Sequence, residues 1–174
     1  MKTLINYIKE NDEVLYAVDE IKWLSKKDID NLVQLAKKNI KKRVRICTHN
    51  DLNNILHEMF IIHLKDCYVR PHYHLKKSES LHVIKGELDM VLFKDNGKIK
   101  KVIEMGSFGS GKQFYQRIDS SIPHTLIIKS DYLVFHEVTN GPFNKRDTIF
   151  PEWSPETNVG HSNKFLEKVN ELKH

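Results

Sequence analysis

The segment with the clearest chemistry holds two histidines one residue apart, followed by a glutamate. His72 and His74 are two positions apart, and Glu79 comes shortly after them. On a β-strand, side chains two positions apart point to the same face, so both imidazoles can reach one point. Later in the chain His124 follows a proline. Three imidazoles and one carboxylate suit a divalent transition-metal ion, with Fe, Mn, Zn, Ni and Co all compatible.

The number of protein ligands predicts the kind of metal site. The chain has 10 histidines, so a chance His-x-His pair means little by itself. A His-x-His pair followed at this spacing by Glu79 and later by a Pro-His pair arises by chance far more rarely. If the ion is six-coordinate, four protein ligands leave two positions for water or substrate, as in a catalytic site. We therefore predict one divalent transition-metal ion bound by His72, His74, Glu79 and His124.

Two further side chains share the strand parity of His72 and His74. Arg70 is expected to point toward the metal site unless Pro71 introduces a bulge. There it can hold an anionic substrate or pair with an acid such as Glu137. Tyr68 can donate a hydrogen bond to substrate or fill the core. His49 can line the mouth of the site, so our candidates for substrate binding are Arg70, Tyr68 and His49.

The elements that must position these residues are mostly short strands. Residues 14 to 18 predict a strand, and Ser25 with Asp28 predicts the start of a helix that continues to about Lys38. The turn Asp95-Asn96-Gly97 predicts a hairpin, and residues 163 to 172 predict a terminal amphipathic helix. Eight further strands are expected over 55–65, 67–74, 79–85, 87–93, 99–104, 113–118, 124–129 and 132–139. Strands this short, with no helix between them, predict an antiparallel sandwich or barrel.

Length and composition indicate one globular domain. The chain has 174 residues, 40% of them hydrophobic and 29% charged, which excludes collagen-like and disordered classes. We expect a strand and helix segment over 1–50, a barrel over 51–160 and a helix over 161–174. No apolar run reaches the ~20 residues of a membrane span, and the N-terminus does not resemble a signal peptide. With only two cysteines, the sequence predicts a cytoplasmic protein without membrane partners.

A basic stretch contributes much of the net charge of +5. Its members are Lys37, Lys38, Lys41, Lys42, Arg43 and Arg45. One interpretation is a solvated helix end, where lysines suit the negative pole of the helix dipole. The other is a docking surface for an acidic partner or nucleic acid. Because no nucleic-acid motif accompanies the stretch, we expect a small-molecule substrate and no nucleic-acid partner. Exposed sheet edges predict a homodimer.

The spacing of the metal-site residues resembles the first cupin motif. That motif is the run from His72 through Glu79 to Gly86, and His124 takes the place of the histidine of the second motif. The second motif departs from the usual pattern, because Pro123 directly precedes His124. The resemblance implies a mainly β fold, the cupin double-stranded β-helix or jelly-roll barrel, with an N-terminal helix and a short C-terminal helix.

Nearly the whole chain resembles the WbuC family of cupin-fold metalloproteins. The resembling stretches are 43–49, 68–74, 79–86, 135–143 and 151–155. The family is associated with gene clusters for surface polysaccharides, and it supplies no settled reaction. In the run 133–138 either His136 or Glu137 must face inward, and the resemblance favours Glu137. A buried carboxylate there can carry a proton or close the barrel through a salt bridge. Trp153 is expected to cover one end of the sandwich.

These features lead to two functional hypotheses. The first is a metal-dependent enzyme that isomerises or epimerises a small anionic sugar-like metabolite, with Glu137 and Arg70 as candidate catalytic residues; the same ligands also permit an Fe(II) oxygenase. The second is a noncatalytic module that binds a metal and a small ligand, as a sensor or accessory subunit. Fold kinship alone does not decide between them.

Overall fold

The computed structural model describes residues 4–156, 167 and 171. Its elements follow in the order β1 (Tyr7–Lys9), β2 (Val14–Ala17), α1 (Lys26–Lys38), β3 (Arg43–Cys47), β4 (Leu56–Leu64), β5 (Tyr73–His74), β6 (Glu79–Lys85), β7 (Glu87–Phe93), β8 (Ile99–Gly106), η1 (Phe108–Ser110), β9 (Tyr115–Ile118), β10 (His124–Ile128), β11 (Tyr132–Asn140), η2 (Lys145–Asp147) and β12 (Thr148–Ile149). The η elements are single turns of 3-10 helix.

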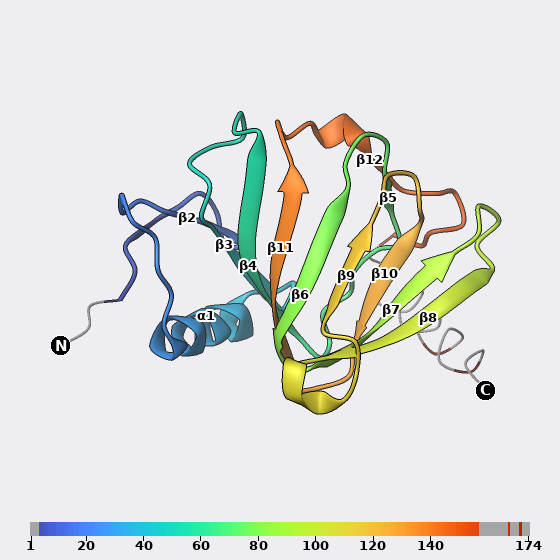
Figure 1. The fold of residues 1–174 in the computed structure, drawn as a ribbon, viewed down its shortest axis with the longest axis horizontal. Coiled ribbons are helices and arrows are strands. Elements are labelled where there is room, and N and C mark those ends of the chain that lie inside the picture. Colours follow the sequence, from blue (N-terminus) through green and yellow to red (C-terminus); the bar gives the residue numbers. More distant parts are fainter. Residues whose placement is uncertain (1–3, 157–166, 168–170, 172–174) are drawn as a thin grey trace.

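Two β-sheets of unequal size make up the barrel (Figure 1). The larger has the strand order β1-β2-β3-β4-β11-β6-β9, and the smaller has the order β10-β7-β8. All neighbours pair antiparallel except β2 and β3. A short third sheet pairs β5 with β12. The chain crosses from the larger to the smaller sheet between β6 and β7, and it changes sheet at every step from β8 through β9 and β10 to β11. Such crossing between two sheets is typical of a jelly roll.

The central strands β3, β4 and β11 of the larger sheet bury residues on both of their faces. Val44, Ile46 and Ile62 lie in one core cluster, together with buried residues of α1. The neighbouring positions Met59 and Ile61 lie in a second cluster, which also contains buried residues of β7 and β10. Successive side chains on a strand point to opposite faces. The first cluster therefore joins the sheet to the helix, and the second fills the barrel.

Helix α1 begins as the sequence predicts. The Ser25 side chain accepts a hydrogen bond from the backbone N–H of Asp28, and the Asp28 carboxylate accepts one from the backbone N–H of Ser25 at 2.7 Å. This reciprocal capping box satisfies two N–H groups that the first turn leaves unpaired. The same carboxylate accepts from the Ile5 N–H at 2.8 Å, so the cap also fixes the segment before β1. Leu32, Val33 and Ala36 are buried against the sheet.

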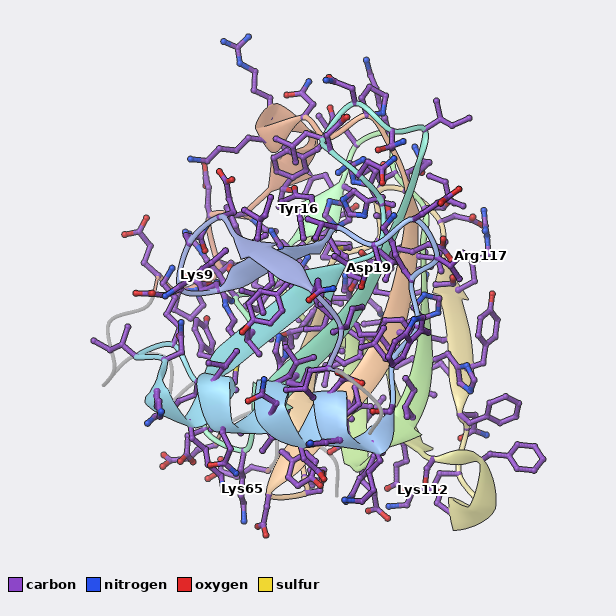
Figure 2. All side chains as sticks on the ribbon, turned by 90° about the vertical axis from the view of Figure 1, so that its left-hand side faces the viewer. Lys9, Tyr16, Asp19, Lys65, Lys112 and Arg117 are labelled. Carbon is purple, nitrogen blue, oxygen red and sulfur yellow. The ribbon has the colours of Figure 1, made fainter. Side chains whose placement is uncertain are left out.

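A view from the side places the helix across one face of the larger sheet (Figure 2). Lys9 on the edge strand β1 and Arg117 on the edge strand β9 appear on opposite sides of that view. Within the described part of the chain, no helix combines the length and the apolar character needed to cross a membrane.

Three features differ from the sequence prediction. Lys37 and Lys38 form the exposed last turn of α1, as expected of a solvated helix end. The rest of the basic stretch differs, because Arg43–Cys47 forms strand β3 beside β2 and β4. The strand expected over 67–74 is confined to Tyr73–His74. Two short strands, β1 and β12, were not predicted. The expected C-terminal helix lies outside the described residues, apart from Glu167 and Glu171.

Candidate metal centre

Two backbone hydrogen bonds bring His72 and His124 together. The His72 N–H donates to the His124 carbonyl at 3.1 Å, and the His124 N–H donates to the His72 carbonyl at 2.9 Å. His74 follows on β5, and its ring centroid lies 5.1 Å from that of His72 and 6.1 Å from that of His124. Each histidine offers one ring nitrogen, and the three nitrogens lie within 4.8 Å of one another.

A hydrogen bond on Nδ1 orients each imidazole. His72 Nδ1 lies 2.8 Å from the Arg70 carbonyl, and His124 Nδ1 lies 2.8 Å from the Ile122 carbonyl. A carbonyl only accepts, so both rings donate a hydrogen bond from Nδ1. In His72 this leaves Nε2 as the nitrogen that can bind an ion. His74 Nδ1 lies 3.2 Å from the Thr148 hydroxyl on β12. Such partners fix the tautomer and direction of metal-binding histidines.

Glu79 supplies the acidic group of the cluster. Its two carboxylate oxygens lie 2.7 Å from His124 Nε2 and 3.1 Å from His74 Nε2. Burial alone would raise the pKa of Glu79, but the hydrogen bonds to His124 and His74 outweigh it and hold this pKa well below the usual value. Burial alone would lower the pKa of His124. The hydrogen bond to Glu79 outweighs burial, so the pKa of His124 is raised. Glu79 therefore lies within hydrogen-bond distance of two of the three histidine rings, while the group that could hold an ion is formed by the three histidines.

The donor set fits a divalent transition-metal ion. Burial, and then the neighbouring His124, lower the pKa of His72 to about 4, so this ring stays neutral near pH 7. Neutral imidazoles and carboxylates are the ligand forms that bind such ions. The sequence-predicted residues His72, His74, Glu79 and His124 thus meet at one place. Glu79 was found because β6 begins there, directly after the loop that follows β5.

A cavity of about 690 Å³ opens beside this cluster, between the two sheets. The inner face of the larger sheet forms one of its walls. The strand register places His57, Thr139 and Glu79 in one row across β4, β11 and β6. In the next row Glu137 lies between Met59 and Leu81. His136, on the opposite face, stacks on Phe60 with ring centroids 4.7 Å apart.

Glu137 lines the cavity without a fixed partner. In the described part of the chain, its carboxylate makes no hydrogen bond and no ion pair. Burial first, and then the negative charge of Glu79, raise the pKa of Glu137 to about 8, while Arg45, His124 and Lys77 oppose the rise. A buried, unpaired carboxylate with a raised pKa can accept and return a proton. The salt bridge considered from the sequence does not form within the described residues.

Arg70 and Tyr68 do not face the cavity, contrary to the sequence prediction. The Arg70 guanidinium donates to the Ser154 carbonyl at 3.0 Å and to the Ser154 hydroxyl at 3.3 Å, and it lies 4.5 Å from the centre of the Phe150 ring. The Tyr68 hydroxyl donates to the Pro155 carbonyl at 2.8 Å. Both side chains therefore hold the segment after β12 in place.

The parity argument failed at Arg70 because residues 67–71 are not a strand. The alternation of side chains holds only along regular extended backbone. Here Val69 lines the cavity instead, and its carbonyl accepts a hydrogen bond from the Thr125 hydroxyl. Trp153 packs against Phe93, with ring centroids 5.0 Å apart. Phe93 lies on the face of β7 that points away from the barrel core, so Trp153 covers the outer face of the smaller sheet and not, as was expected, one end of the sandwich.

His49 does line the cavity, as expected. Its ring stacks on His57 with centroids 4.1 Å apart, and its Nδ1 contacts the backbone of Glu58. Basic residues also line the cavity where the sequence did not indicate them, among them Arg45 and Lys77. Arg45 carried a usable signal, since Arg43, Arg45 and Cys47 alternate with Val44 and Ile46 as in a strand. Lys77 lies in a loop, where no periodic pattern marks it.

Comparisons with known proteins give little at the level of sequence. A family model described as a domain of unknown function (DUF6016) matches residues 24–105. No curated protein matches the chain. Protein SO0799 from Shewanella oneidensis is a structural match with a TM-score of 0.55 and 7% identity, over 70% of this chain and 82% of that one.

Other structural matches are more partial. CapF, a capsular polysaccharide assembling protein from Staphylococcus aureus, has a TM-score of 0.46 and 20% identity, and the match covers 56% of this chain and 27% of CapF. A point mutant of oxalate decarboxylase from Bacillus subtilis has a TM-score of 0.47 and 18% identity, over 67% of this chain and 28% of that chain. This chain therefore spans less than a third of either protein. These likenesses concern the fold alone. The predicted mainly β jelly roll with a helix near the N-terminus is confirmed by the two sheets and by α1.

Proposed function

We propose that this protein is a metal-dependent cupin enzyme that isomerises or epimerises a small, anionic, sugar-like metabolite. The observation that carries the proposal is the joint placement of two groups at one cavity. His72, His74, His124 and Glu79 gather at the cavity wall, and the unpaired carboxylate of Glu137 lines the same space. A site for metal and a proton carrier next to it are the two components that such a reaction needs.

Separate residues of the site would bind the metal and transfer the proton. His72, His74, His124 and Glu79 would hold the ion, which supplies Lewis acidity toward a carbonyl oxygen of the substrate. Glu137 would take the proton from the carbon next to that carbonyl. Returning it to the former carbonyl carbon, while the proton of the neighbouring hydroxyl passes to the former carbonyl oxygen, isomerises the substrate. Returning it to the other face of the same carbon epimerises the substrate. Both reactions conserve atoms and electrons, so no second cofactor is required.

The cellular setting of this activity is part of the proposal. The resemblance of the sequence to the WbuC family supports a role in surface polysaccharide biosynthesis. Cys47 and Cys67 are both buried and unpaired, and burial raises the pKa of their thiols to about 11 and 12. Two thiols kept in the free form fit a reducing compartment, so we place the protein in the cytoplasm.

The test is solvent-proton exchange into substrate. The protein is reconstituted separately with each candidate metal and incubated in D₂O with sugar phosphates and nucleotide sugars, while NMR follows deuterium at the carbon next to the carbonyl. We expect exchange with at least one substrate class. The Glu137→Gln variant should lose roughly 100-fold or more of the exchange rate, the usual contribution of a general base, and keep its metal.

Glu58→Gln provides the matched control. Glu58 lies on β4 one position before Met59, with its side chain 43% exposed and near His136. Its exchange rate should equal that of the wild type. Equal exchange in the Glu137→Gln and wild-type proteins would refute the role of Glu137. Metal and sugar binding without any turnover would favour the noncatalytic binding module instead.

A further inference from the structure

Two basic side chains that line the cavity, Arg45 and Lys77, have no part in the proposed reaction. Both residues line the same cavity as the metal ligands. Arg45 belongs to β3 and Lys77 to the loop between β5 and β6, so they reach the cavity from separate parts of the fold. The cation expected from the sequence, Arg70, is bound to Ser154 instead. Arg45 and Lys77 are therefore the candidates for holding an anionic group.

Lys77 is a buried ammonium group. Lys77 is only 5% exposed, and its Nζ lies 4.5 Å from the centre of the Phe143 ring. Among the described residues, no carboxylate lies within ion-pair distance of it. Removing an ammonium from water is costly without a counter-charge, and a cation–π contact offsets only part of that cost. An anion bound in the cavity would supply the missing counter-charge.

Arg45 presents a guanidinium group with free donors. The register pairs Arg45 with Ile61 on β4, and Ile61 with Phe135 on β11, so Arg45 shares the inner face of the sheet. Its neighbour on that face, Arg43, is held by Glu13 at 2.6 Å. In the described structure the Arg45 side chain makes no hydrogen bond or ion pair. A free guanidinium can bind a carboxylate or phosphate through two parallel hydrogen bonds.

Glu137 lines the same cavity as Arg45, Lys77 and the metal ligands. On the inner face of the larger sheet it lies between Met59 and Leu81, one row from Thr139 and Glu79. A substrate held by both the metal cluster and the two basic residues would therefore share the cavity with the proton carrier.

We propose that Lys77 and Arg45 bind the anionic group, a phosphate or a carboxylate, of a substrate whose other end lies at the metal cluster. This inference rests on the proposed function in one respect, that the end of the substrate at the metal cluster is the carbonyl that reacts. The binding of the anionic group does not depend on it. It names the substrate class as a sugar phosphate or a sugar acid, with its charge set apart from the carbonyl.

Calorimetric titration of the full-length, metal-loaded protein with two probes tests this inference. The probes are inorganic phosphate and acetate. We expect the wild type to bind at least one of them, with phosphate the tighter for a sugar-phosphate site and acetate the tighter for a sugar-acid site. Lys77→Met and Arg45→Met should each raise the dissociation constant roughly tenfold or more, the usual effect of losing a charge-assisted hydrogen bond. Lys77→Arg should retain binding.

Lys76→Met is the matched control, because Lys76 neighbours Lys77 in the same loop but is exposed. It should bind both probes as the wild type does. Arg45 is exposed to solvent, so Arg45→Met keeps the test valid if replacing Lys77 disturbs its loop. Equal dissociation constants in Arg45→Met, Lys77→Met and Lys76→Met, or no binding of either probe to the wild type, would overturn the inference.

Metal content and proton exchange are measured on the same samples. Loss of probe binding in Arg45→Met and Lys77→Met, with metal retained but no exchange in any protein, would support the anion site and refute the isomerase. Proton exchange that is lost in Glu137→Gln but unchanged in Arg45→Met and Lys77→Met would support the isomerase and refute the anion site.

Discussion

His72 and His124 lie directly opposite each other and exchange two backbone hydrogen bonds, at 3.1 and 2.9 Å. This single bridge joins the segment before β5 to the start of β10. Their ring centroids are 4.7 Å apart, and each Nδ1 is held by a carbonyl two residues earlier. The backbone therefore fixes both rings before any ligand binds, which is the preorganisation that a metal site needs.

Glu79 is predicted to contribute directly to metal affinity. Glu79→Gln removes the negative charge but keeps the size of the side chain, and we expect the metal dissociation constant to rise roughly 10- to 100-fold. The measurement is competition with a chromophoric chelator. Glu104→Gln, at an exposed position on β8, should bind metal like the wild type. Unchanged affinity in Glu79→Gln would show that the carboxylate is not a ligand.

Arg70 is predicted to stabilise the fold without serving the cavity. Arg70→Gln should lower the free energy of unfolding by about 1–2 kcal/mol, because it loses hydrogen bonds to Ser154 and the contact with Phe150. Urea denaturation measures the loss, and Arg117→Gln on the edge strand is the surface control. Metal content and phosphate binding should stay at wild-type levels. A loss of phosphate binding in Arg70→Gln would show that Arg70 contributes to substrate binding after all.

His63 is predicted to make the protein less stable in mild acid. Burial, assisted by Arg43 and Arg45 and opposed by Glu13, lowers the pKa of His63 to about 3. Between the usual histidine value and that pKa, the unfolded chain takes up a proton that the folded protein does not. Stability therefore falls as pH decreases, by about 2 kcal/mol from this group between pH 6.5 and 5.

Replacement of His63 separates this contribution from the others. In His63→Leu the free energy of unfolding should depend less steeply on pH over that range, whereas His82→Leu, on the exposed face of β6, should follow the wild type. Denaturant titrations at several pH values provide the comparison. An unchanged slope in His63→Leu would mean that His63 is protonated in the folded protein.

Much of the fold was predictable because local signals agree with the final structure. The helix start at Ser25 and Asp28 and the Asp95-Asn96-Gly97 turn each depend on a few neighbouring residues. The metal cluster was predictable for a related reason. His72 and His74 keep the two-residue alternation, and Glu79 begins the next strand of the barrel.

The sequence-based predictions were wrong where contacts between distant parts of the chain decide the local structure. The lysines before β3 favour a helix end, and only pairing with β2 and β4 makes Arg43–Cys47 a strand. At Arg70, strand parity was extended through Pro71 into backbone that is not a strand. Lys77 lies in a loop, and its burial depends on contacts with residues far along the chain, such as Phe143. No local pattern carries that information.

The metal stoichiometry of the purified protein tests the central claim most directly. After reconstitution with each candidate divalent ion and removal of the excess, inductively coupled plasma mass spectrometry should find one ion per chain in the wild type. The double variant His72→Ala/His124→Ala should bind none, and His82→Ala/His136→Ala, with the same number of imidazoles removed elsewhere, should bind one. A wild type that retains no transition metal, or equal metal in the two double variants, would contradict the account.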